Sequence, residues 1–183
     1  MHSKKFTLTT LLATALIYLL LDAVNRALFS SAALSSGENW IYLPAGLRLA
    51  FILIFLGTGA VAIALASCAI GLIHFSGMDP VTVLGAGLIS GFSPWLARVI
   101  CLEKFKLDTQ LHHLNLAALV KIALTFAALN AVLQQLWFTW CNPSTHFIEA
   151  TAKMFMADML GTVILLYIAK YSLSLLPAPD QLK

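Results

Sequence analysis

The sequence predicts an all-α, polytopic membrane protein: a transmembrane helical bundle of about six spans that forms a single domain over residues 1–183. Composition indicates this, because 60% of the residues are hydrophobic and only 10% are charged. A soluble domain is about 45–50% apolar and about 25% charged. The apolar residues also fall in runs that approach the roughly 20 residues a helix needs to cross a bilayer. We therefore expect the lipid bilayer to surround nearly the whole chain.

Six apolar runs follow one another along the chain. The first, Phe6–Val24, lacks a small-x-small cleavage site after it, which favours a retained helix over a cleaved signal peptide. The second and third, Tyr42–Gly57 and Gly59–Phe75, are short. The glycines between them can supply the positive φ of a tight turn. The remaining runs are Pro80–Leu102, Leu114–Trp137 and Phe147–Leu176, and the prolines after Leu176 end the last helix.

Basic residues are distributed unevenly between the two ends of these spans. If the N-terminus is cytoplasmic, only Arg26 falls in the outer loops, and Lys153 lies near the outer start of the last span. Cytoplasmic loops are rich in Lys and Arg, so we expect a protein of the bacterial inner membrane with both termini on the cytoplasmic side. The predicted cytoplasmic ends carry Lys4, Lys5, Arg98, Lys104, Lys106, Lys170 and Lys183. The predicted outer interface holds the aromatic residues Trp40, Tyr42, Trp137 and Trp140.

Two ionisable residues lie inside apolar spans at similar depth. A charge at mid-helix costs roughly 2.5–3.5 kcal/mol to insert, so each needs a partner. Arg48 lies roughly 12 Å below the outer interface and Asp158 roughly 16 Å, at about 1.5 Å per residue. We predict that these two side chains are neighbours and that Asn130 reaches the same level. They form either a structural ion pair or a pocket that captures a ligand or senses a partner.

Other chemistry is not indicated by the sequence. The Arg48 and Asp158 positions have no nucleophile beside them. The cysteines (Cys68, Cys101 and Cys141) lack the spacing of a metal site. We therefore expect no enzymatic activity, no metal and no cofactor, and the net charge of +3 gives no reason to expect nucleic-acid binding. Asp22 and Arg26 lie four residues apart and are expected to pair on one helix face.

Two segments resemble a known family. Trp40–Leu49 (WIYLPAGLRL) is similar to the Pro-Ala-Gly signature that opens the membrane-associated sensor domain of the first class (MASE-type). Met156–Leu166 (MADMLGTVILL) resembles the Gly-Asp-x-Leu-Gly run of its closing helix, with Ala157 in place of the first glycine. A glycine-rich helix over Leu84–Leu96 lies between them, as in the family. The matching positions are Pro44, Ala45, Gly46, Asp158 and Gly161.

The resemblance implies signal reception. In bacteria such domains are usually fused to histidine kinases or diguanylate cyclases, and we expect a stand-alone version here without an output domain. It would bind a small ligand or a membrane partner and relay its state to a separate signalling protein. The expected binding residues are Arg48, Asp158, Asn130, Trp40, Pro44, Gly46 and Gly161.

Two other functional classes fit the size and the number of spans. One is the substrate-binding membrane subunit of an energy-coupling uptake transporter, which would need a coupling surface for its partner, often with small residues on a cytoplasm-facing helix. The other is a structural accessory subunit of a larger membrane complex.

Overall fold

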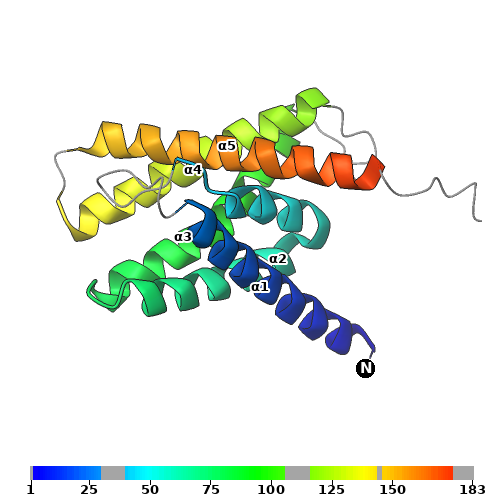
Figure 1. Cartoon of the computed structure of the whole chain (residues 1–183), viewed down its shortest axis with the longest axis horizontal. Helices are drawn as coiled ribbons and strands as arrows, with labels where there is room; N and C mark the ends of the chain where they lie inside the picture. Colours follow the sequence, from blue (N-terminus) through cyan, green and yellow to red (C-terminus); the bar gives the residue numbers. More distant parts are fainter. Residues whose placement is uncertain (1, 30–39, 106–115, 144–145, 175–183) are drawn as a thin grey trace, which may run out of the picture.

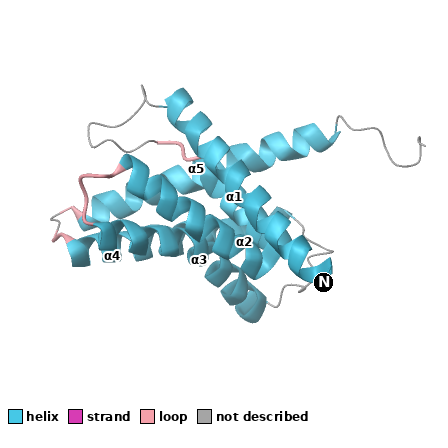
Figure 2. Ribbon diagram, turned by 90° about the horizontal axis from the view of Figure 1, so that it is seen from below, coloured by secondary structure: helices cyan, strands magenta, loops and turns pink. Residues whose placement is uncertain are grey.

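The computed structural model describes residues 2–29, 40–105, 116–143 and 146–174. All secondary structure in these ranges is helical (Figure 2), which confirms the predicted all-α class. Five helices in the described ranges are long and apolar enough to cross a bilayer, and the chain is a membrane protein on this basis. They are α1 (His2–Phe29), α2 (Pro44–His74), α3 (Pro80–Phe105), α4 (Leu116–Cys141) and α5 (Phe147–Ser174).

The second and third predicted spans form one helix, α2, which is broken at Leu56. The contacts of α1 show that the two halves of α2 run in opposite directions. Thr7 of α1 lies beside the break, and farther along α1 the Tyr18 hydroxyl accepts a hydrogen bond from Ser67 in the second half. Farther still, Asn25 binds the backbone just before the first half. Residues 44–55 are therefore antiparallel to α1, and residues 57–74 are parallel to it.

The turn at the break differs from the glycine turn that the sequence suggests. The positive φ falls on Leu56 (φ 53°, ψ −130°) and not on Gly57 or Gly59. Gly59 has another role, because a Cβ atom there would lie 2.8 Å from the carbonyl oxygen of Phe51. The glycine thus lets the second half of α2 start close against the first half.

We predict that Leu56→Gly stabilises the protein. The backbone at Leu56 resembles the first central position of a type II′ turn, which glycine normally occupies. A side chain in such a region costs about 1–3 kcal/mol, and the greater freedom of an unfolded glycine offsets part of the gain. We expect a net gain of about 1 kcal/mol, read as a higher apparent melting temperature in detergent. A Leu56→Ala control keeps the strained Cβ and should not gain stability.

The remaining helices alternate in direction. α3 runs back along the second half of α2, α4 is antiparallel to α3, and α5 is antiparallel to α4. The N-terminal end of α1 and the last turn of α5 consequently lie at the same end of the bundle, on the right of Figure 1. The direction of α3 against α2 follows from two contacts, Gly91 with Ala64 and Gly71 with Val83. That of α4 against α3 follows from Trp137 with Thr82 and Ser93 with Asn130. That of α5 against α4 follows from Gln135 with Met154 and Asn130 with Asp158.

Two apolar clusters hold these segments together. The first joins α1 to both halves of α2, and the second joins the first half of α2 to α3 and α4. The first comprises Tyr18, Phe51, Ile52, Ala60, Ile63, Ala66 and Ile70. The second comprises Ala45, Leu49, Ala97, Cys101, Ile122, Ala123 and Phe126. The candidate site adjoins the second cluster, because Phe126 belongs to that cluster and Cζ of Arg48 lies 5.4 Å from the centroid of its ring.

Candidate functional site

Four helices each contribute one buried polar side chain to a single cluster, which we call the Arg48 centre: Arg48 (α2), Ser93 (α3), Asn130 (α4) and Asp158 (α5). Nη2 of Arg48 lies 3.0 Å from Oδ1 of Asp158, so the predicted pairing of these two charges is confirmed. Asn130 donates from Nδ2 to the other carboxylate oxygen of Asp158 at 2.6 Å. Its Oδ1 accepts from the Ser93 hydroxyl at 2.8 Å and, at a longer 3.5 Å, from Nη1 of Arg48.

The Arg48 guanidinium lies between aromatic rings and is only 2% exposed. Its Cζ is 5.1 Å from the ring centroid of Tyr42 and 5.4 Å from that of Phe126, within cation–π distance. Nε of Arg48 has no hydrogen-bond partner among the described residues. The centre therefore neutralises its charge well but keeps one buried donor unused, which is costly in a dry interior.

The segment that carries Arg48 is fixed by its neighbours on α1 and α5. Pro44 stands in the first turn of α2, where its missing N–H costs no helical hydrogen bond. Just before it, the backbone N–H of Tyr42 donates to the carbonyl oxygen of Ala157 at 3.2 Å. The backbone N–H of Leu43 donates to Oδ1 of Asn25 at 3.0 Å. The start of α2 is thus bound to both α1 and α5.

Two glycines allow α5 to approach this segment closely. A Cβ added at Gly161 would overlap the carbonyl group of Tyr42. A Cβ added at Gly46 would lie 2.8 Å from Cβ of Leu165. The structure therefore brings Gly46 and Gly161 to the crossing of α2 and α5. Trp40 lies outside this contact and is 49% exposed.

A second polar cluster lies between α1 and α2, and we call it the α1 centre: Tyr18, Asp22, Arg26, Tyr42 and Ser67. Arg26 binds Oδ2 of Asp22 through Nε at 2.8 Å and Nη2 at 2.5 Å, as the four-residue spacing predicted. The Tyr42 hydroxyl donates to Oδ1 of Asp22 at 3.3 Å and lies 3.0 Å from the Tyr18 hydroxyl. Tyr42 belongs to both centres, since its hydroxyl faces Asp22 and its ring faces Arg48.

The contact between α3 and α4 is also polar. Nε2 of Gln134 donates to the carbonyl oxygen of Ala86 at 2.9 Å and to the Ser90 hydroxyl at 2.8 Å. Nε1 of Trp137 donates to the carbonyl oxygen of Thr82 at 2.9 Å. Trp137, predicted as an outer-interface anchor, thus also binds α3 inside the bundle.

Sequence reasoning missed Ser93, Phe126 and the role of the Tyr42 ring. Ser93 precedes Pro94 in a segment that reads as small and apolar, so its buried hydroxyl gave no distinct signal. Phe126 lies one helical turn before Asn130, and this spacing could have placed it beside Arg48. The position of Tyr42 near the start of a span predicts a place at the outer interface, and only the fold shows that its side chain faces Asp22 and Arg48.

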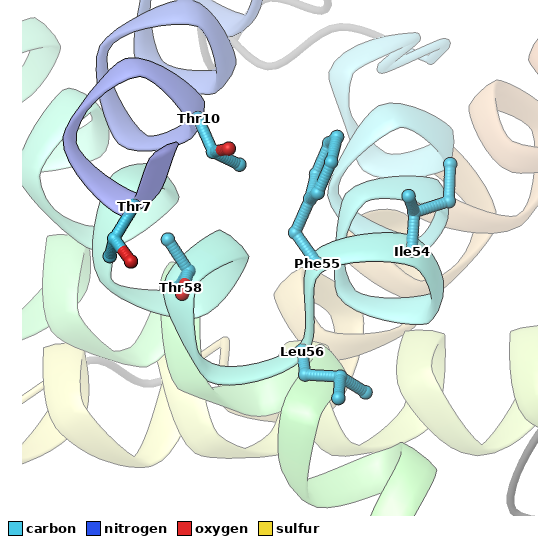
Figure 3. A pocket seen from close by; sticks show the side chains of 6 residues that line it. All are labelled: Thr7, Thr10, Ile54, Phe55, Leu56 and Thr58. Carbon is cyan, nitrogen blue, oxygen red and sulfur yellow. The ribbon is translucent and has the colours of Figure 1, made fainter. Parts of the chain in front are cut away.

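A cavity of about 370 Å³ lies away from these centres, between α1 and the break in α2. Figure 3 shows Thr7 and Thr10 of α1 facing Phe55 and Thr58 across it. The described residues of its lining are three threonines and three apolar residues. None of them belongs to the Arg48 centre or to the α1 centre.

The Arg48 centre holds one positive and one negative charge, paired with each other, and hydrogen-bonding groups from α3 and α4. Among the described residues, no group of three or more His, Cys, Asp or Glu side chains is placed to hold a metal ion. Comparison with known protein families, curated proteins and solved structures finds no match to this chain.

Proposed function

We propose that this chain is an integral membrane signal-reception module whose Arg48 centre responds to a small ligand or a membrane partner. The observation that carries the proposal is the buried ion pair between Arg48 and Asp158, which ties α2 to α5 with help from α3 and α4. Ionisable residues inside a membrane are expensive and generally serve binding or switching. A ligand or partner that competes for either charge would loosen the hold of α2 on α5.

The resemblance to MASE-type sensor domains supports the same function. Its two segments pack against each other at the candidate site, where Gly161 meets the Tyr42 carbonyl and Gly46 meets Leu165. A ligand changes such a module only if it binds one helix arrangement better than the other. In this proposal, the Arg48–Asp158 ion pair is the contact that is present in one arrangement of α2 and α5 and lost in the other.

The uptake-transporter alternative receives less support. The coupling surface of such a subunit often presents small residues to its partner. Two glycines of α3 instead pack against α2 inside the bundle, Gly87 against Cys68 and Gly91 against Ala64. Nothing specific favours the accessory-subunit alternative.

We also propose that both termini face the cytoplasm in a bacterial inner membrane. The basic residues motivate this orientation, and the alternating helix directions are compatible with it. In a variant without native cysteines, an impermeant thiol reagent added to intact cells should label a cysteine at Pro143. It should not label one at Ser3 until the cells are opened. Labelling at Ser3 in intact cells would overturn the orientation.

The function is tested by identifying the partners that co-purify in mild detergent. We expect a histidine kinase or a diguanylate cyclase to accompany the wild-type protein. The charge-swapped variant Arg48→Asp with Asp158→Arg should fold but lose or alter this association. Co-purification of ATPase and permease subunits instead would favour uptake, and an unchanged partner set in the swapped variant would remove the Arg48 centre from the mechanism.

A further inference from the structure

Tyr42 is the residue shared by the buried Arg48 centre and the partly buried α1 centre. Its hydroxyl donates to Asp22 in the α1 centre at 3.3 Å. Its ring faces the Arg48 guanidinium, with Cζ of Arg48 5.1 Å from the ring centroid. One side chain thus contacts an aspartate on α1 and an arginine on α2, and that arginine binds an aspartate on α5.

The backbone of Tyr42 has little freedom to move. Its N–H is bound to α5 through the Ala157 carbonyl at 3.2 Å, and its own carbonyl lies against Gly161. The next N–H, that of Leu43, is bound to Asn25 on α1 at 3.0 Å. With the backbone held at these points, the side chain is the part of Tyr42 that can respond to a change in the hydroxyl partners, and its ring faces Arg48.

The α1 centre reaches closer to the surface than the Arg48 centre does. The Arg26 side chain is 33% exposed, whereas those of Arg48 and Asp158 are 2% exposed. Arg26 is bound to the same Asp22 carboxylate that accepts from Tyr42, although through the other oxygen. A group that competes for Arg26 or Asp22 from outside the bundle would therefore change the charge that the Tyr42 hydroxyl faces.

We propose that Tyr42 is a positioning residue that couples the α1 centre to the Arg48 centre, so that a change at Asp22 is felt at the Arg48–Asp158 ion pair. In the proposed signal-reception function, Asp22 would then be where a signal enters and Tyr42 the residue that passes it to Arg48. The biological role of the coupling rests on that proposed function. The physical coupling itself is independent of any partner or ligand.

The arginine side chains provide a direct test, because the chain has only three: Arg26, Arg48 and Arg98. In protein carrying ¹⁵N-labelled arginine in detergent micelles, each Nε–H gives one NMR signal, and Arg48→Lys assigns that of Arg48. We expect Asp22→Asn to shift the Arg48 signal clearly. In a Tyr42→Phe background, which keeps the ring but removes the hydroxyl, the same substitution should leave the Arg48 signal in place.

An exposed aspartate, Asp79, and a third arginine, Arg98, serve as controls. Asp79→Asn changes a carboxylate that binds the backbone N–H of Thr82 at the start of α3. It should not move the Arg48 signal, and Asp22→Asn should not move that of Arg98. The coupling would be overturned if Asp22→Asn left the Arg48 signal unchanged. It would also be overturned if Asp22→Asn still shifted that signal in the Tyr42→Phe background. If Asp22→Asn shifts the Arg48 signal through Tyr42 but the protein recruits no signalling partner, the coupling stands and only the proposed function is refuted.

Discussion

Asp158→Ala is expected to unfold a large fraction of the protein, because it leaves the Arg48 guanidinium buried without its carboxylate. Removing one partner of a buried ion pair costs about 3–5 kcal/mol, a large share of the stability of a typical domain. Here the loss also strands Nδ2 of Asn130, which donates to the same carboxylate at 2.6 Å. The measurements are the yield of monodisperse protein and the apparent melting temperature in detergent.

Two further variants separate a structural loss from a loss of binding. The apolar pair Arg48→Met with Asp158→Leu should be more stable than Asp158→Ala, since no unpaired charge remains buried. The charge-swapped pair should recover part of the stability, but a ligand site should stay inactive, because the charge pattern of the ligand is unchanged. If Asp158→Ala proved no worse than the double apolar variant, an uncompensated charge at Arg48 could not be the cause.

The control for Asp158 is Glu149, a second carboxylate on the same helix. Glu149 pairs with Lys153 at 2.7 Å, but its side chain is 60% exposed. Exposed pairs contribute little to stability. We expect Glu149→Ala to leave the apparent melting temperature nearly unchanged, so a similar loss from both substitutions would contradict a special role for the Arg48 centre.

Gly161→Ala is expected to separate α5 from the start of α2. The added methyl group would overlap the Tyr42 carbonyl, and backbone atoms cannot rotate aside as a flexible side chain can. Overpacking of this kind costs about 1–3 kcal/mol, and Gly161→Leu should cost more. We expect a lower apparent melting temperature, together with loss of the ordered Arg48 signal.

Gly57 is the matched glycine for this prediction. A Cβ at Gly57 would meet nothing within 4 Å, so Gly57→Ala should be tolerated. If Gly161→Ala were tolerated equally well, close packing of α5 on the Tyr42–Leu43 backbone would not contribute to the fold.

Local information explains which features could be predicted from the sequence. The helical bundle follows from long apolar runs, because a chain in lipid must satisfy its backbone hydrogen bonds within each segment. The Arg48–Asp158 pair was predictable because few charges lie inside the spans and each needs a partner at its own depth. The Asp22–Arg26 pair follows from spacing on one helix, where residues four apart face each other.

The turn in α2 shows where local information ends. Glycines marked its place correctly, but the conformation that reverses the chain is adopted by Leu56. Gly59 instead allows a close contact with the carbonyl oxygen of Phe51, a residue of the first half of α2. A glycine pattern thus indicates where a chain can turn, but not which residue adopts the positive φ.

The sequence alone determined that this chain is a helical membrane protein with a buried charge pair in its interior. Only the tertiary structure decided that Tyr42 turns inward, that Ser93 and Phe126 complete the Arg48 centre, and that the α1 centre adjoins it. The physical reason is that burial cost acts on each residue by itself and can be read along the chain. The direction of a side chain depends on which helices cross beside it, and those crossings are set by contacts between distant segments.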